Sequence, residues 1–229
     1  TVEDKEFSKF QTNLTNIISN LPSDKLTTQN YKFKFSDKKE AYTIESPINY
    51  NIQSFNYKDL GYNVKGSLQV LSPLVNSFLW DTLRVKGGAY GAYLSADETG
   101  EMTIFTYRDP RIKESFQDIK TIPKFLENAD KISPMQLNQY KLDALKSYYI
   151  PNSIYEKAYK SDILYFSGVS DDYRQNCIDE ILNTTSDDLK SYSKIFEDGL
   201  KENRITTIGN SKTIEASKEL FDSIEPIVK

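Results

Sequence analysis

Two adjacent glycines, Gly87 and Gly88, separate a helical pattern from a strand pattern. Before them, apolar residues recur at helical spacing from Pro73 to Arg84. After them, the residues from Tyr90 to Ala96 have the composition of a β-strand. Glycine ends helices because it lacks a Cβ and readily adopts a positive φ. The chain is therefore expected to pass from a helix into a sheet here, and the turn can aim its two flanking side chains at one ligand.

The helical pattern before the glycines carries its own start signal. Ser72 can cap the helix, and Pro73 suits the first helical position because proline has no N–H group to satisfy there. A short separate run, Gly66 to Leu71, precedes it. The helix is expected to bury one apolar face, formed by Leu74, Val75, Phe78, Leu79 and Leu83. Trp80 is expected in the core as well, because aromatic residues at helical spacing are usually buried.

Strand patterns occur on both sides of the turn-forming stretch Asp97 to Gly100. The runs Tyr90 to Ala96 and Met102 to Tyr107 predict an antiparallel hairpin that follows the helix. Two earlier β-like runs, Ala41 to Glu45 and Asn49 to Tyr57, are separated by a serine-proline pair that interrupts strand pairing. Both earlier runs could lie in one sheet.

Most of the chain from Ile112 to Leu220 has a helical pattern, with one strand-like run from Arg204 to Ile208. The predicted helix breaks are Ser133-Pro134, Pro151-Asn152, Gly168 and Thr184 to Ser186. A sheet first and helices after it predict an α+β fold.

The N-terminal residues follow a different pattern. Apolar residues from Lys5 to Leu21 predict an amphipathic helix, and residues 23 to 40 are polar, with aromatic residues spaced as in a short strand or an ordered loop. The sequence shows no internal repeat and no flexible linker. One domain over residues 1–229 is the simplest division, although the first 22 residues could be the end of a preceding element.

Composition excludes several classes of function. The formal charge of −4, without a basic block, argues against nucleic-acid binding. Apolar runs are far shorter than the ~20 residues that cross a bilayer, so no membrane partner and no targeting segment are expected. Cys177 is the only cysteine, which excludes an intrachain disulfide and fits a reducing compartment such as the cytoplasm. It is expected to be a small buried side chain rather than a reactive thiolate.

The chain contains no histidine. Hydrolytic zinc sites nearly always include imidazole, so no metal site is expected in this segment. Ser-His-Asp and Cys-His catalysis are excluded for the same reason, and no phosphate-binding P-loop pattern occurs. A pair of catalytic carboxylates remains open, although nothing in the sequence selects one.

The segment Arg84 to Gly91 is similar to the R-x-x-G-G-A-Y-G segment of insulinase-like (pitrilysin) zinc metallopeptidases, specifically the presequence peptidase and falcilysin branch. Other segments resemble that branch in the same order, and two of them differ from its pattern at one position each. They are Pro47 to Tyr50, Leu79 to Asp81, Gly168 to Gln175 and Ile181 to Thr185.

This resemblance implies a C-terminal domain built of an antiparallel sheet backed by helices. It also implies that Arg84 and Tyr90 reach a zinc site on an N-terminal catalytic half. Gly87 and Gly88 would join them in substrate binding. The parent enzyme would bind zinc outside this segment and cleave short unstructured peptides, and the segment alone would be inactive. The expected partners are the N-terminal half and a peptide substrate.

Other interpretations remain open from the residues alone. Arg84 could complement the helix dipole, the glycines could simply supply a positive φ, and Tyr90 could fill a strand position. The chain could also belong to a non-catalytic assembly subunit of similar fold or to a peptide-binding module. An H-x-x-E-H motif upstream would separate the enzyme from both.

Overall fold

The computed structural model describes residues 3–23, 27, 39–63, 66–97, 99–166 and 172–227. The chain divides into two compact units, and each is described by itself. The smaller unit comprises residues 1–34 and 151–171, and the larger comprises residues 35–150 and 172–229. The single domain and the separate origin of the first 22 residues stay predictions. Most of the predicted strand or loop at residues 23 to 40 lies outside the described residues, as does the predicted break at Gly168.

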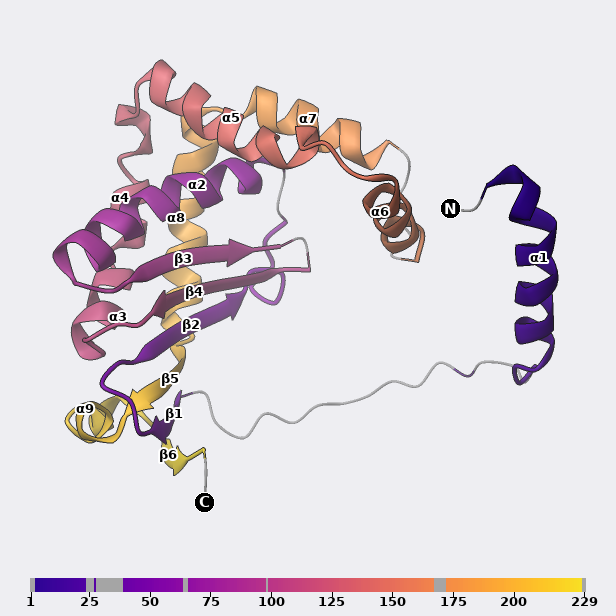
Figure 1. Cartoon of the computed structure of the whole chain (residues 1–229). Helices are drawn as coiled ribbons and strands as arrows, with labels where there is room; N and C mark the ends of the chain where they lie inside the picture. Colours follow the sequence, from indigo (N-terminus) through magenta and orange to yellow (C-terminus); the bar gives the residue numbers. More distant parts are fainter. Residues whose placement is uncertain are drawn as a thin grey trace. The chain divides into compact units, whose positions relative to one another are not determined.

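The larger unit contains the sheet (Figure 1). Its strands are β1 (Lys39–Ile44), β2 (Tyr50–Asn56), β3 (Gly91–Ala96), β4 (Glu101–Tyr107), β5 (Arg204–Asn210) and β6 (Ser223–Pro226). Its longer helices are α2 (Ser67–Leu79), α5 (Pro134–Tyr149), α7 (Tyr173–Asn183) and α8 (Ser186–Lys201). Its shorter helical segments are η1 (Trp80–Lys86), α3 (Lys113–Ile119), α4 (Ile122–Leu126), η2 (Ala129–Lys131), α9 (Ser211–Glu215) and η3 (Lys218–Leu220).

The sheet has the strand order β3-β4-β2-β5-β1-β6. Neighbouring strands from β3 to β5 pair antiparallel, whereas β1 is parallel to both β5 and β6. The predicted hairpin of β3 and β4 and the α+β fold are confirmed. The sheet is not antiparallel throughout, because β5 inserts between β1 and β2. Both early β-like runs therefore lie in one sheet without pairing with each other.

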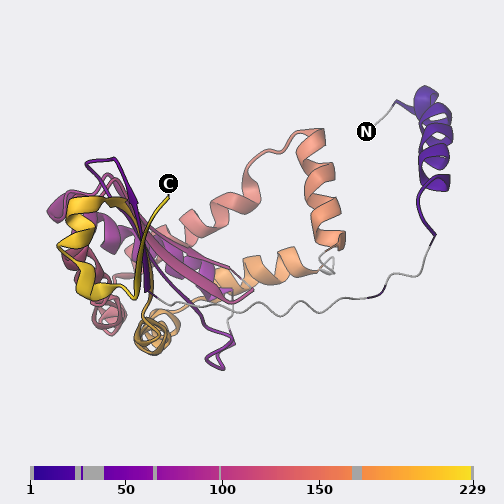
Figure 2. The ribbon, with the colours of Figure 1, turned by 90° about the horizontal axis from the view of Figure 1, so that it is seen from below.

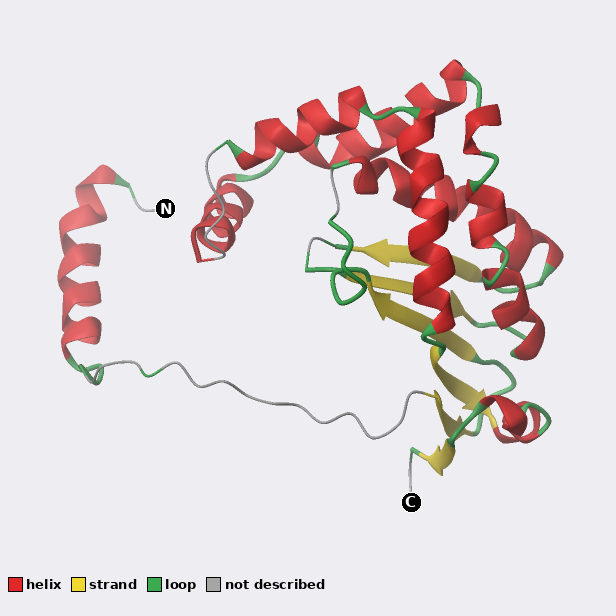
Figure 3. Ribbon diagram, turned by 180° about the vertical axis from the view of Figure 1, so that it is seen from behind, coloured by secondary structure: helices red, strands yellow, loops and turns green. Residues whose placement is uncertain are grey.

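Helix α8 packs across one face of the sheet. It lies behind the strands in Figure 1, in front of them in Figure 3 and to one side of them in Figure 2. Phe196 meets Phe55 of β2 edge to face at 5.6 Å between ring centroids. Gly199 permits this close approach, since a Cβ there would collide with the Phe55 ring. Burying these large rings is the main favourable contribution at this contact.

Local signals explain where two of the longer helices begin. Ser133 forms a capping box with Gln136 at the start of α5, and Thr185 forms one with Asp188 at the start of α8. In each box a side-chain oxygen accepts a backbone N–H that the first helical turn leaves unpaired. The breaks predicted at these positions are therefore confirmed.

The start of α2 differs from the prediction. The helix begins at Ser67, so Ser72 is no cap and Pro73 lies inside the helix. Leu68 and Leu71 are buried like the residues that follow the proline. Packing of this continuous apolar face outweighs the backbone hydrogen bond that a proline removes from a helix interior.

The smaller unit contains α1 (Asp4–Ser19) and α6 (Ile154–Phe166). Helix α1 matches the amphipathic helix expected from Lys5 to Leu21, and none of its residues is buried. Across the described residues, no helix is long and apolar enough to span a membrane.

Candidate functional site

The turn at Gly87 and Gly88, called the glycine turn from here on, follows a change from α-helix to π-helix. Helix α2 continues without a break into a π-helical turn, Trp80–Lys86. The Gly88 N–H then donates to the Arg84 carbonyl at 2.9 Å, and the Ala89 N–H donates to the Leu83 carbonyl at 3.0 Å. Gly88 has φ +84°, a left-handed conformation that side chains rarely adopt. π-Helical turns of this kind often occur at functional sites.

Arg84 lies between two aromatic rings. Its Cζ atom is 3.9 Å from the ring centroid of Trp80 and 5.3 Å from that of Tyr90. Both distances fall in the range of cation–π attraction. Trp80 is 45% exposed, so its predicted place in the core is wrong. Leu79 and Leu83 fill the core from the same stretch, which leaves the indole on the outer side, where it supports the guanidinium.

Tyr90 is anchored through its backbone and exposes its phenol. Its N–H donates to the carbonyls of Tyr107 at 3.1 Å and Arg108 at 3.4 Å, whereas its side chain is 63% exposed. The Tyr107 ring meets it edge to face at 5.9 Å, and Tyr50 meets Tyr107 in the same way at 5.4 Å. The sequence did not single out Tyr107 or Tyr50 as neighbours of the site, because their positions depend on strand register.

The two glycines play different structural parts. Gly87 is buried against the Arg111 side chain, and a Cβ there would collide with that guanidinium and with the Leu83 carbonyl. Gly88 has room around it, since its nearest possible contact is a Pro110 carbon at 3.5 Å. Gly87 is therefore required by close packing, and Gly88 by its positive φ.

The structure thus brings all four predicted site residues to one turn. Within the described part of the chain, no carboxylate lies within salt-bridge distance of the Arg84 guanidinium. The guanidinium is a permanent cation with several donors, and a phenol hydroxyl can donate one more hydrogen bond. Such a pair can stabilise a carbonyl oxygen or a carboxylate of a ligand.

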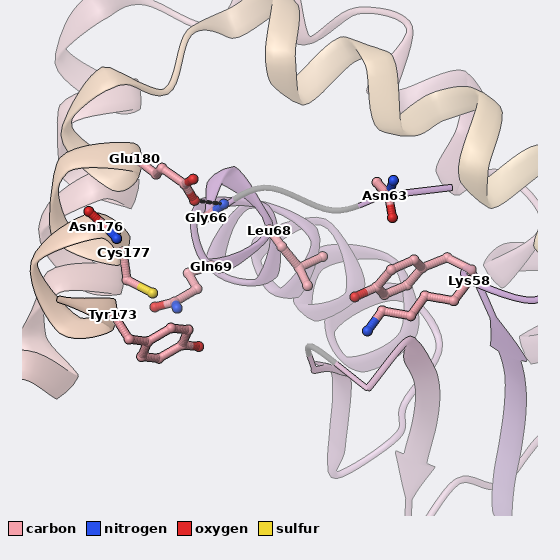
Figure 4. A pocket seen from close by; sticks show the side chains of 10 residues that line it. Lys58, Asn63, Gly66, Leu68, Gln69, Tyr173, Asn176, Cys177 and Glu180 are labelled. Atoms are coloured by element: carbon pink, nitrogen blue, oxygen red, sulfur yellow. Dashed lines mark hydrogen bonds between the residues drawn. The ribbon is translucent and has the colours of Figure 1, made fainter. Parts of the chain in front are cut away.

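A hollow of about 420 Å³ lies elsewhere in the larger unit, between α7 and the start of α2 (Figure 4). Polar side chains such as Lys58 and Gln69 line it, together with Cys177, which is buried as predicted. The Glu180 carboxylate accepts a hydrogen bond from the Gly66 N–H, so it caps α2. None of the residues that line this hollow belongs to the glycine turn.

No described group of three or more His, Cys, Asp or Glu side chains could hold a metal ion. The donor set of the described residues therefore does not fit a zinc site.

Solved structures resemble this fold. The chain is similar to pitrilysin, with a TM-score of 0.59 and 14% identity over 90% of this chain and 23% of that one. It is also similar to a protease from Helicobacter pylori, with a TM-score of 0.62 and 15% identity over 91% of this chain and 53% of that one. These likenesses define the fold class, that of the pitrilysin-type peptidases.

Sequence comparison defines the family. The family model described as the PreP C-terminal domain matches residues 39–211. The chain therefore belongs to this family and is a C-terminal region of an insulinase-like peptidase. The resemblance found at the glycine turn is thereby confirmed for most of the chain.

Curated relatives are much longer than this chain. Protein HypA of Clostridium perfringens is 29% identical over 99% of this chain and 23% of its own length. Presequence protease 1 of Arabidopsis thaliana is 28% identical over 78% of this chain and 17% of its own length. The chain thus spans about a fifth of the length of the curated relatives it matches.

Proposed function

We propose that this chain is the C-terminal domain of a zinc-dependent peptidase that degrades short unstructured peptides. In this proposal, Arg84 and Tyr90 bind the substrate and stabilise the oxyanion that forms at the scissile carbonyl. The observation that carries it is the open arrangement of Arg84, whose guanidinium lies over the Trp80 ring and beside the exposed phenol of Tyr90. The relatives whose names include presequence protease support the substrate class.

The partner in this proposal is the N-terminal half of the same enzyme, which would hold the zinc ion. Zinc in such enzymes activates a water molecule for attack on the peptide bond. Arg84 and Tyr90 would contribute without changing protonation state, by donating hydrogen bonds to the carbonyl oxygen as negative charge develops there. The exposed Gly88 would let the peptide approach the backbone of the turn, whereas Gly87, which lies under the Arg111 side chain, would act by holding the shape of the turn. The isolated chain is then expected to be inactive.

Cleavage of a quenched fluorescent peptide by the full-length protein tests this proposal. Loss of one oxyanion donor typically lowers kcat by about 10²- to 10³-fold, and we expect a fall of this order for Tyr90→Phe and for Arg84→Ala. If Arg84 binds the substrate equally well before and during the reaction, its replacement raises KM instead.

Tyr149→Phe is a matched control for the tyrosine variant. Tyr149 is 64% exposed, and the Arg174 Cζ atom lies 5.6 Å from its ring centroid, much as Arg84 lies beside Tyr90. Full activity of both Tyr90→Phe and Arg84→Ala would contradict the proposal. A wild-type full-length protein that binds no zinc and cleaves nothing would favour a non-catalytic assembly subunit.

A further inference from the structure

A cluster of fully buried polar side chains lies beneath the glycine turn. Asn51 donates from Nδ2 to Thr106 Oγ1 at 3.2 Å, to Asp109 Oδ2 at 3.2 Å and to the Arg111 carbonyl at 2.8 Å. Asp109 Oδ2 also accepts from the Ser115 hydroxyl at 2.7 Å. Each side chain of this cluster except Arg111 is at most 1% exposed. The side chains of Asn51, Thr106, Asp109 and Ser115 are all paired in this way. Buried polar groups that pair with one another hold one geometry, because a movement of any one of them breaks hydrogen bonds that water does not replace.

Asn49 ties the same cluster to β5 and α9. Its backbone exchanges two hydrogen bonds with Asp109, at 2.9 and 2.8 Å, and its Nδ2 donates to the Asp109 carbonyl at 3.1 Å. Its Oδ1 accepts from the Thr213 hydroxyl at 2.8 Å and from the Asn210 N–H at 3.1 Å. Asn49 belongs to the Pro47 to Tyr50 segment, for which no function was evident in the sequence.

The cluster fixes the loop from Arg108 to Arg111. Arg108 has φ 52°, a left-handed conformation that costs a non-glycine residue energy. The Asp109 carboxylate accepts the Arg111 N–H at 2.9 Å, so the loop is held on both sides of Pro110. The hydrogen bonds of the cluster thus maintain a backbone conformation that the loop would not prefer alone.

This loop in turn supports the candidate site. The Tyr90 N–H donates to the Arg108 carbonyl, Pro110 lies beside Gly88, and the Arg111 side chain covers Gly87. A second contact comes from Tyr50, whose ring meets Tyr107 beside Tyr90. Displacement of the loop would therefore move the turn that separates Arg84 from Tyr90.

We propose that Asn49, Asn51, Asp109 and Ser115 are positioning residues, which set the orientation of Arg84 and Tyr90 through the loop from Arg108 to Arg111. This inference rests on the proposed function for its catalytic consequence, but its structural part can be tested alone. The inference assigns a role to the Pro47 to Tyr50 segment, which acts through the buried hydrogen bonds of Asn49 rather than through an exposed surface or apolar packing.

The structural test uses Trp80, the single tryptophan of the chain, whose ring lies 3.9 Å from the Arg84 guanidinium carbon. We expect Asp109→Asn and Ser115→Ala to change the emission and the acrylamide quenching of the folded 229-residue chain. Ser193→Ala is the control, because the Ser193 hydroxyl donates a hydrogen bond of similar length, 2.9 Å, to the Pro123 carbonyl and joins α8 to α4 rather than to the buried cluster. Emission and quenching that stay at wild-type values in a folded Ser115→Ala chain would overturn the inference.

The kinetic test uses the full-length protein. Small misplacements of catalytic groups can lower rates by up to about 10²-fold, and we expect Ser115→Ala to lower kcat about tenfold with little change in KM. In a Tyr90→Phe background the same substitution should lower kcat clearly less than tenfold, since only its effect through Arg84 remains and coupled residues are not additive. An equal loss in both backgrounds would show that Ser115 does not act through Tyr90. If the full-length protein cleaves no peptide, the proposed function fails, while the Trp80 measurement still decides the positioning inference.

Discussion

Replacing Gly88 with alanine measures the cost of the turn's backbone conformation separately from its packing. Gly88 and Gly61 share φ +84°, and a Cβ would meet no atom closer than 3.5 Å at Gly88 and none within 4 Å at Gly61. Gly61 lies in the connection that follows β2, away from the site. Alanine at Gly88 and alanine at Gly61 should therefore cause nearly the same backbone strain, at two different places in the structure.

The expected magnitude follows from these geometries. An L-residue in the left-handed region destabilises the folded state by roughly 1–2 kcal/mol. Replacing glycine with alanine also lowers the conformational entropy of the unfolded chain, which stabilises the folded state by about 0.5 kcal/mol. Each alanine should thus lower the free energy of unfolding by about 1 kcal/mol, or Tm by about 2–4 °C for a chain of this size. Gly87→Ala should cost more, about 1–3 kcal/mol, because its Cβ would overlap the Arg111 guanidinium and the Leu83 carbonyl.

Denaturant unfolding of the three variants, combined with peptide cleavage by the full-length protein, tests this reasoning. Gly88→Ala and Gly61→Ala should lose similar stability, whereas only Gly88→Ala should lose activity. Gly88→Asn should recover part of the stability, since asparagine tolerates the left-handed region better than alanine. A Gly88→Ala variant as stable as wild type would refute the strain argument, and an equal loss of activity at Gly61 would remove its link to the site.

Two further predictions concern pH. Burial raises the pKa of the Tyr192 phenol to about 12, so the folded state should lose about 2–3 kcal/mol of stability as the pH rises from 10 toward 12, where the unfolded chain ionises first. Tyr192→Phe should flatten this alkaline loss in denaturant midpoints, and should cost about 1 kcal/mol at neutral pH through the lost hydrogen bond with Ser67. Hydrogen bonds from Tyr62, Lys194 and Lys201 lower the pKa of the Asp198 carboxyl from 3.8 to about 2. Stability should fall as the pH drops through this interval, and Asp198→Asn should show a shallower acid limb, whereas an unchanged limb would contradict the assignment.

Much of the fold could be predicted because its signals are local. The hairpin of β3 and β4, the turn at Gly87 and Gly88 and the helix starts at Ser133 and Thr185 each depend on a few adjacent residues. The parallel pairing of β1 with β5 could not be predicted in this way. It joins segments more than 160 residues apart, and their pairing depends on where β2 binds β5 rather than on either sequence alone.

The candidate site shows the same division. Arg84 and Tyr90 could be chosen from spacing and resemblance, and both lie at the turn. Trp80 was wrongly predicted in the core because an aromatic residue at helical spacing fits the buried face as well as the outer face of the helix. Only the packing of its neighbours decides which side it faces. The buried cluster around Asp109 was missed entirely, since its members come from β2, β4, the loop before α3 and α3 itself.

The core therefore determines the orientation of the candidate site. Leu79 and Leu83 are both fully buried and lie four residues apart. Trp80 and Arg84 are also four residues apart, and they lie on the outer side of the same helical stretch. Because the leucines fix the rotation of the π-helical turn, the indole and the guanidinium have little freedom to leave their stack. A cavity-forming Leu83→Ala would then loosen Arg84 as well as lower stability by about 2–5 kcal/mol, so mutations in the core and mutations at the site should not be additive.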